Sequence, residues 1–224
     1  MNTLKRTYTP PITILFAIII FALGASTSFS QVTDIDGYKY KTVTIGSQEW
    51  TAENLNAEHY RNGDIIPQVQ DVDEWIKLTT GAWCYYKNDT VLGKTYGKLY
   101  NWYAVNDSRG LAPEGWHIPT FEEWKQLTDY LGGDTAAGGK LKANTIWESP
   151  NEGATNSSGF SAIPGGIRDV NGHFYIIDKF GYFWAATEYN SDLAWFHMLY
   201  YYFPDVYRIV YKKTRGMSVR CVKD

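Results

Sequence analysis

The sequence lacks the motifs that mark several common classes of enzyme. No H-E-x-x-H spacing links its histidines, and neither a G-x-S-x-G turn nor a phosphate-binding glycine loop occurs. These absences exclude the zinc proteases, serine hydrolases and P-loop nucleotidases that depend on those motifs. The four histidines are dispersed along the chain: His59, His117, His173 and His197. We expect His117, which lies between two large apolar residues, to be a packed structural residue.

Runs of basic residues are also missing. The chain has 21 lysines and arginines against 24 aspartates and glutamates, a formal net charge of −3. Proteins that bind nucleic acid through its phosphates need clustered cations. We therefore expect no nucleic-acid partner.

No apolar run reaches the roughly 20 residues that span a bilayer. The run from Ile12 to Ala25 follows Lys5 and Arg6 and precedes small polar residues, a layout typical of a secretory signal peptide. We expect cleavage of residues 1–30 to leave one domain, 31–224, that is secreted, periplasmic or at the cell surface. The alternative is an uncleaved signal anchor, which would be the protein's membrane contact. No cysteine lies directly after the run, which excludes a lipid anchor on a lipobox cysteine.

Cysteine is scarce, with only Cys84 and Cys221 present. An exported chain meets an oxidising compartment, so we expect a disulfide between them. The alternative is two buried free thiols. In the segment "GMSVRCVKD", Met217, Val219 and Cys221 alternate with polar residues, which places Cys221 on the core side of a strand.

Segments rich in Thr, Val, Ile and aromatic residues predict strands over much of the chain. We expect a hairpin at 38–50 that turns near Gly46, and a short helical piece near Trp75 inside a long loop. Further strands are expected at 81–86, 181–189, 194–203, 206–213 and 216–224. The segment 140–174 is dominated by glycine, asparagine and serine without sustained periodicity, which is more often functional than accidental.

One helix is well specified. Thr120 and Glu123 form a capping-box pattern, in which each side chain satisfies a backbone N–H of the first turn. Trp124, Leu127 and Leu131 then recur on one face, and a Gly-Gly pair follows. The pattern predicts a helix of about three turns whose apolar stripe is buried.

Five segments, in order from about Asp34 to Asp224, resemble the Fibrobacter succinogenes major paralogous domain family. They are "DIDGYKYKTVTIGSQEWTAENL", "YGKLYNWYAV", "LAPEGWHIPTFEEWKQLTDYLGG", "GATNSSGFSAIPGGIRDVNGHF" and "GMSVRCVKD". The resemblance implies an exported domain of a kind common in Bacteroidetes-type bacteria and mostly without an assigned function.

More remotely, "WHIPTFEEWKQL" resembles the "RLPTEAEWE" segment of formylglycine-generating sulfatase-modifying enzymes. This similarity implies an α+β, C-type-lectin-like fold with two main helices on twisted antiparallel strands and a long irregular loop region that carries the binding surface. It also implies a helix at 97–105. Those enzymes use two reactive cysteines close together near the C-terminal end, whereas Cys84 and Cys221 are far apart in sequence, so we do not expect this activity.

Calcium-dependent sugar sites of C-type lectins carry an "EPN" triplet and a later "WND". Here "ESPN" at 148–151 is interrupted and no "WND" follows, so we expect no cofactor, and calcium lacks support. "DIDG" at 34–37 opens like a calcium loop, but Ile45 occupies the twelfth position, where a bidentate glutamate belongs. We expect a plain turn there.

Aromatic residues are abundant, with nine tryptophans, 18 tyrosines and 10 phenylalanines. Exposed Trp and Tyr rings stack on sugar rings while a polar edge remains for hydrogen bonds. We expect Trp50, Trp102, Trp116 and Trp124 to lie in the core. For Trp184, Trp195, Tyr200 and Tyr202, core and surface positions both remain open.

The favoured hypothesis is a non-catalytic, exported binding or adhesion domain that recognises a glycan or a cell-surface protein. The candidate contact residues are Arg168, Asn171, Trp184, Glu188, Trp195, Tyr200 and Tyr202. The alternatives are an enzyme with diverged chemistry on the same fold and a structural component of the cell surface. No catalytic residue is assigned.

Overall fold

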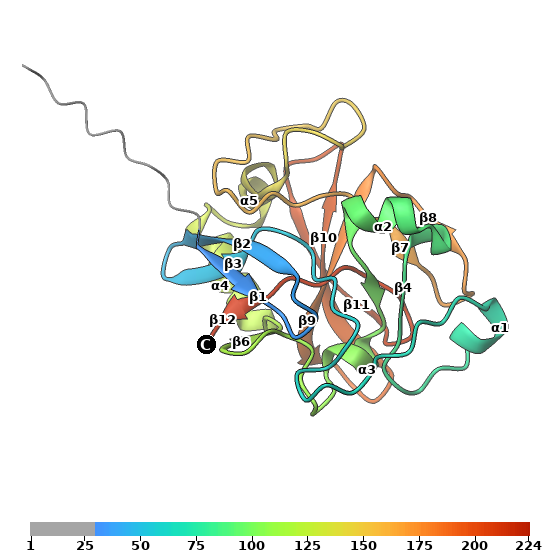
Figure 1. Cartoon of the computed structure of the whole chain (residues 1–224). Coiled ribbons are helices and arrows are strands. Elements are labelled where there is room, and N and C mark those ends of the chain that lie inside the picture. Colours follow the sequence, from blue (N-terminus) through green and yellow to red (C-terminus); the bar gives the residue numbers. More distant parts are fainter. Residues whose placement is uncertain (1–29) are drawn as a thin grey trace, which may run out of the picture.

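The protein is described by a computed structural model that covers residues 30–224 (Figure 1). The expected signal peptide occupies residues outside this range, apart from Ser30. The fold combines short helices with mostly antiparallel strands. Within residues 30–224, no helix has both the length and the apolar character that crossing a bilayer requires.

The first sheet has five strands in the order β1-β2-β3-β12-β6, and all of its neighbours are antiparallel. The strands are β1 (Gln31–Thr33), β2 (Lys39–Ile45), β3 (Gln48–Thr51), β6 (Trp116–His117) and β12 (Val222–Lys223). The predicted hairpin is confirmed, since β2 pairs with β3 across a turn in which Gly46 has a φ of 63°. A positive φ of this size costs glycine less than any other residue.

The second sheet has three strands in the order β11-β10-β9, also antiparallel. They are β9 (Phe180–Glu188), β10 (Leu193–Tyr200) and β11 (Val206–Lys212), which confirms the three strands predicted in this part of the chain. Alternate side chains face two cores. Tyr182, Trp184 and Phe196 point into one, while Phe183 and Leu199 point into the other.

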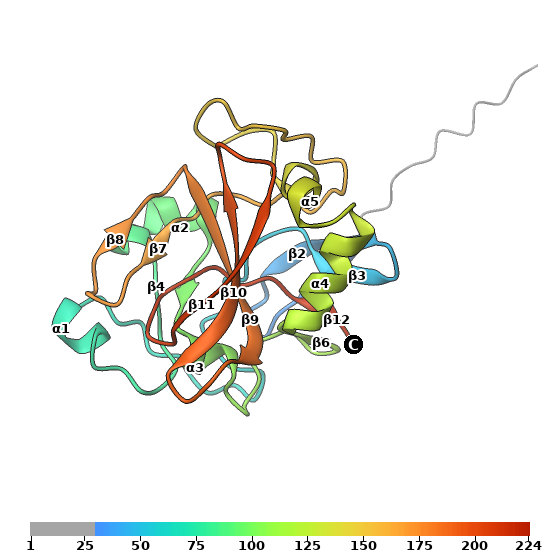
Figure 2. The same cartoon turned by 180° about the vertical axis from the view of Figure 1, so that it is seen from behind.

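Helix α4 (Phe121–Tyr130) matches its prediction in start, stop and buried face. Thr120 and Glu123 form the capping box, and Gly132 and Gly133 with positive φ end the helix. Trp124 packs against Trp50, Phe160 and Phe183. Helix α5 (Asp134–Leu141) follows and contacts β11, so both helices cover one face of the three-stranded sheet (Figure 2).

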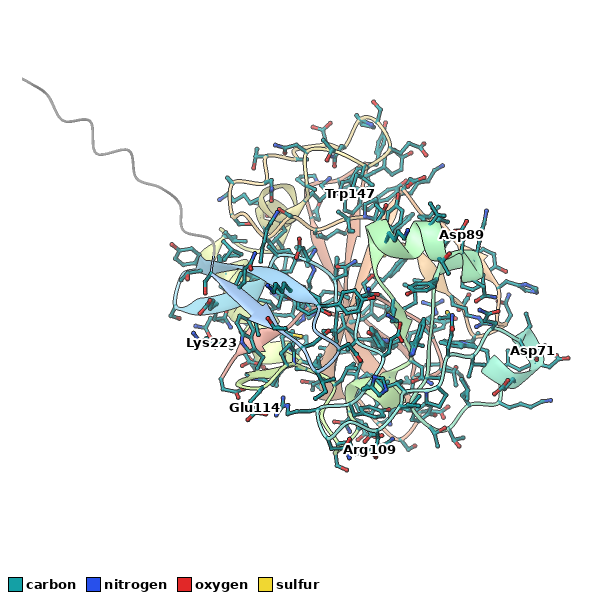
Figure 3. The ribbon with its side chains drawn as sticks, viewed as in Figure 1. Asp71, Asp89, Arg109, Glu114, Trp147 and Lys223 are labelled. Atoms are coloured by element: carbon teal, nitrogen blue, oxygen red, sulfur yellow. The ribbon has the colours of Figure 1, made fainter. Side chains whose placement is uncertain are left out.

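The remaining elements are short, and buried residues from several of them, such as Trp75, Cys84 and Leu99, form a third core cluster. These elements are α1 (Val72–Trp75), β4 (Trp83–Cys84), η1 (Tyr86–Asn88), α2 (Thr90–Tyr96), β5 (Leu99–Tyr100), α3 (Trp102–Val105), β7 (Ile167–Arg168) and β8 (Phe174–Tyr175). Asp71 and Asp89 cap the starts of α1 and α2 with their carboxylates (Figure 3). The helical piece predicted near Trp75 is therefore confirmed.

The helix expected at 97–105 is wrong for most of its length. Gly97 ends α2 with a φ of 75°, Leu99 and Tyr100 pair with β4, and only α3 is helical. Leu99 and Tyr100 form a short strand instead, in which Tyr100 also bridges to Met217, and both residues are buried.

The C-terminal segment 216–223 passes through the middle of the molecule. Met217 bridges to Tyr100, Ser218 bridges to Phe183, and Val222 joins β3 to β6. All of its residues from Gly216 to Val222 are buried. Cys221 lies in the core as predicted, but the polar residues of the segment are buried as well.

Candidate functional site

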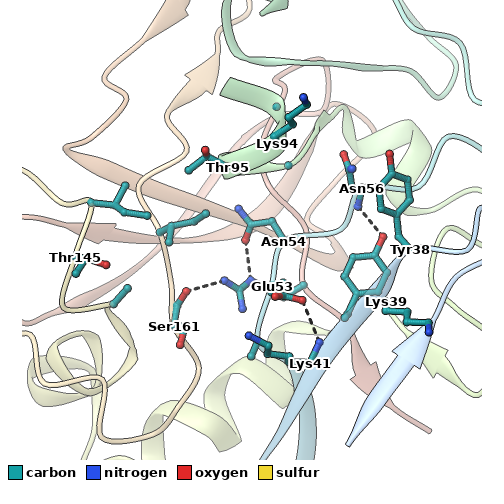
Figure 4. A pocket seen from close by; sticks show the side chains of 18 of the residues that line it. Tyr38, Lys39, Lys41, Glu53, Asn54, Asn56, Lys94, Thr95, Thr145 and Ser161 are labelled. Atoms are coloured by element: carbon teal, nitrogen blue, oxygen red, sulfur yellow. Dashed lines mark hydrogen bonds between the residues drawn. The ribbon is translucent and has the colours of Figure 1, made fainter. Parts of the chain in front are cut away.

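A cleft of about 930 Å³ opens between the five-stranded sheet, helix α2 and the irregular region (Figure 4). One wall is the start of β2 with the segment after β3, a second is α2, and the third is formed by loops at 143–146 and 156–163. Its lining is polar and aromatic, with amides, hydroxyls, ammonium groups and three tyrosine rings. The residues used below are Tyr38, Lys39, Lys41, Glu53, Asn54, Tyr85, Lys94, Thr145, Ser161 and Arg220.

Arg220 forms the floor and is fully buried. Its guanidinium donates to Asn54 Oδ1 at 2.7 Å, to the carbonyl oxygens of Thr51 and Phe160 at 2.9 and 2.8 Å, and to that of Ser161 at 3.0 Å. All four acceptors are neutral. Burial lowers the pKa of Arg220 to about 9, because a charged group loses hydration there.

The irregular walls are held in conformations that non-glycine residues rarely adopt. Ile146, Asn156 and Ser161 have φ values of 77°, 48° and 55°. Asn156 and Ser161 stabilise each other, since the Asn156 amide donates to Ser161 Oγ and accepts from the Ser161 N–H, both at 2.9 Å. Strained residues of this kind often cluster at functional sites.

A buried lysine supports the aromatic side of the cleft. The Lys98 ammonium lies 5.5 Å from the Tyr38 ring, 5.2 Å from the Tyr85 ring and 4.4 Å from the Trp83 ring. It donates to the Asn56 backbone carbonyl at 2.6 Å. Burial lowers the pKa of Lys98, although nearby carboxylates, chiefly Glu58, oppose this. The cation fixes the Tyr38 and Tyr85 rings at the cleft by cation–π contact.

Two of the predicted contact residues are buried and unavailable to a ligand in this structure. Trp184 has no exposed surface, and its indole N–H donates to the Tyr100 carbonyl at 2.9 Å. Arg168 is also fully buried; it donates to the carbonyls of Val69, Gln70, Asp71 and Gly172 and stacks on Trp75. Both residues hold the core together, which corrects the sequence-based expectation.

The other predicted contact residues lie at separate places on the surface. Asn171 is in the β7–β8 turn, where its amide donates to the Tyr175 hydroxyl. Glu188 pairs with Lys213 at 2.6 Å. Trp195 packs on Phe121 with ring centroids 4.7 Å apart. Glu188 and Trp195 are neighbours at the open end of the β9–β10 pair, where Glu188 pairs with Ala194, but Asn171 belongs to a different turn and none of the three lines the cleft.

Tyr200 and Tyr202 belong to a group of rings at the tip of the β10–β11 hairpin. Tyr200 stacks on Phe180 with centroids 4.3 Å apart, and Tyr202 and Phe203 next to it are 52% and 44% exposed. Lys142 holds this tip by donating to the carbonyls of Tyr200 and Phe203, each at 3.1 Å. This hairpin tip is therefore another surface at which aromatic rings meet solvent.

The expected disulfide is absent from the described residues. Cys84 and Cys221 are both free and fully buried, and they belong to different core clusters. Burial raises the pKa of the Cys84 thiol to about 12 and raises that of Cys221 further. The alternative of two buried free thiols is the one the structure contains.

The calcium-like motifs have local roles. Asp34 and Asp36 close the "DIDG" turn, in which Asp34 accepts from the N–H groups of Asp36 and Tyr38, as expected for a plain turn. Asn151 of "ESPN" donates to the Ala143 carbonyl at 3.0 Å. Within residues 30–224, no group of three or more metal-ligating side chains comes together.

His117 is half-buried between two carboxylates. Its Nδ1 lies 2.7 Å from Asp224 Oδ1 and its Nε2 lies 2.7 Å from Glu123 Oε1. Burial disfavours the charged imidazole, but these two hydrogen bonds prevail and raise the pKa of His117. The residue ties the start of α4 to the C-terminal strand, which is the structural role expected of it.

The described residues thus form a mixed α and β fold with a large polar cleft. The chain belongs to the Fibrobacter succinogenes major domain family, whose model matches residues 43–223. This confirms the family predicted from the five sequence segments; the family name describes no activity. No match to a curated protein or to a solved structure was found.

Proposed function

We propose that the protein is an exported, non-catalytic binding domain of C-type-lectin-like fold whose cleft recognises a glycan. The observation that carries the proposal is the cleft itself, with a volume of about 930 Å³ and a lining of amides, hydroxyls and three tyrosine rings. Ligand sites usually fall in the range of about 300–1,000 Å³. Amides and hydroxyls suit sugar hydroxyl groups, and tyrosine rings suit the apolar faces of sugar rings.

The chemistry of the thiols supports binding rather than catalysis of the formylglycine-generating kind. Both cysteines are buried away from the cleft, and their raised pKa values keep the thiolate unpopulated near neutral pH. A reactive cysteine needs an accessible thiolate. An enzyme with different chemistry remains the alternative, and turnover that survives Cys84→Ser and Cys221→Ser would establish it.

The first experiment measures binding of the purified protein to a glycan array and to insoluble polysaccharides, with calcium and with chelator. Thr145→Trp would place an indole in the cleft from an exposed position. It should weaken binding at least about tenfold because the ring occupies ligand volume. Thr135→Trp, on an exposed position of α5, is the matched control and should bind like the wild type.

Other outcomes identify other functions. Equal binding by Thr145→Trp and the wild type would show that the cleft is not the site, and loss of binding in Tyr202→Ala would then move it to the hairpin tip. Loss of binding on chelation would identify a calcium requirement. No binding to any glycan, together with capture of a surface protein from the cell envelope, would favour an adhesion partner or a structural role.

A further inference from the structure

The charged side chains that line the cleft are predominantly positive, although the whole chain carries a net negative charge. Lys39, Lys41, Lys94 and Arg220 contribute cations, and Glu53 contributes the carboxylate. The full sequence has 24 acidic residues against 21 basic ones. Cations are therefore concentrated at this place while the rest of the protein is acidic.

Arg220 gives the cleft a positive charge that forms no ion pair within the described residues, although Glu53 is near enough to favour the charged form. Within residues 30–224 no carboxylate oxygen lies within ion-pair distance of it, and its four hydrogen-bond acceptors carry no charge. Buried charges are normally paired, because removing an ion from water is costly. The guanidinium lies directly beneath the cleft surface, where its field acts through little intervening water.

The three lysines extend this positive charge around the cleft. Lys39 and Lys41 alternate along β2, so both face outward beside the cleft, and Lys94 lies on the opposite wall in α2 (Figure 4). None of the three ammonium groups forms an ion pair within the described residues. Glu53 accepts a hydrogen bond from the Lys41 N–H at 3.0 Å, which leaves the ammonium free.

Other carboxylates lie close to the cleft but are already engaged. Asp36 binds His59 and Glu58 lies 3.4 Å from the Lys98 ammonium. Asp34 accepts from Tyr40. None of these carboxylates lines the cleft, so they do not cancel the charge that a ligand would meet there.

We infer that the cleft takes an acidic glycan, whose carboxylate or sulfate groups pair with Lys39, Lys41 and Lys94 above Arg220. This inference rests on the proposed function and specifies its ligand class. A neutral glycan would leave the cations of the cleft without partners, whereas an anionic one exchanges their hydration for ion pairs and hydrogen bonds. Uronate carboxylates and sulfate esters share this chemistry.

The test uses matched pairs of glycans that differ in charge alone. Polygalacturonate is compared with its methyl-esterified form, and a sulfated glycosaminoglycan with its desulfated form, by titration calorimetry at low and physiological salt. The acidic member of at least one pair should bind at least about tenfold more tightly, with the difference shrinking as salt is added. Preference within the first pair identifies carboxylate as the source, and preference within the second identifies sulfate.

Variants assign the effect to the cleft. The triple variant Lys39→Gln, Lys41→Gln, Lys94→Gln should lose the preference for the acidic glycan. The control triple Lys77→Gln, Lys125→Gln, Lys212→Gln removes the same charge from lysines outside the cleft and should keep it. Near-equal melting temperatures of the two triples exclude unfolding as the cause.

Three results would overturn the inference, and they differ in what they mean for the proposed function. Equal affinity for acidic and neutral glycans would refute the acidic ligand while leaving glycan binding intact. Absence of binding to every glycan, charged or neutral, would refute both the inference and the proposed function. Equal loss of preference in both triples would also overturn it, because the effect would then come from overall charge.

Discussion

At the residue scale, the fold depends on charged and polar side chains that are buried and carry out structural work. Arg168, Arg220, Lys98 and Lys142 are all fully buried, and each donates to backbone carbonyl oxygens of irregular segments. A loop without regular pairing must satisfy its carbonyls individually. Long cationic side chains do this here, because one head group reaches several carbonyls at once.

His197 is the residue for which pH should affect stability most directly. It is fully buried on β10, stacks on Trp124 at 4.6 Å, and neither ring nitrogen has a partner within the described residues. Burial, with a smaller contribution from Arg208, lowers its pKa to about 3. The folded protein therefore keeps the ring neutral, while the unfolded chain takes up a proton below about pH 6.5.

The free energy of unfolding should accordingly be unaffected by His197 above pH 6.5 and fall below it, by up to about 1.4 kcal/mol per pH unit. His197→Phe removes this contribution, so its urea unfolding curves should change less between pH 6.5 and 4 than those of the wild type. His173→Gln, at an exposed position, should follow the wild type. An unchanged slope in His197→Phe would contradict the assignment.

At the scale of elements, the sequence predicted the secondary structure correctly where several local signals agreed. It failed where contacts with segments far away in sequence determined the secondary structure. The hairpin at 38–50 and helix α4 follow from turn, capping and periodicity signals. The segment 97–105 has no comparable local signal, and its pairing with β4 comes from tertiary packing. A family likeness could suggest a helix there but could not locate it.

Helix α4 offers a direct check of a local signal. Thr120→Ala removes the side-chain oxygen that accepts from the Glu123 N–H at 3.2 Å. The loss of this cap should lower the free energy of unfolding by about 1 kcal/mol. Thr120→Ser keeps the acceptor and should remain close to the wild type in thermal unfolding. Equal destabilisation by both variants would place the effect in the methyl group's packing instead.

At the scale of the whole molecule, the composition correctly indicated an irregular region but could not locate the cleft. The cleft joins segments near 40, 54, 94, 145, 160 and 220, and no short motif links positions so far apart. A signal existed in "YKYK", whose alternation places Lys39 and Lys41 on one exposed face of β2. Trp184 and Arg168 could not be recognised as core because their burial depends on segments near 70 and 100.

The absence of a cross-link in the described residues is also a property of the whole fold. Unfolding in urea with iodoacetamide and without reductant should give a protein modified at both Cys84 and Cys221, as seen by mass spectrometry, because both thiols are free. The folded protein should resist modification, because both thiols are buried and their pKa values are raised. Modification that requires prior reduction would instead reveal a disulfide.

The central position of segment 216–223 has a consequence for how the protein is made. These residues supply the strand between β3 and β6 and the guanidinium beneath the cleft. A nascent chain that still holds them inside a ribosome or a translocation channel can complete neither the five-stranded sheet nor the cleft floor. The five-stranded sheet and the cleft floor therefore form only after this segment has emerged.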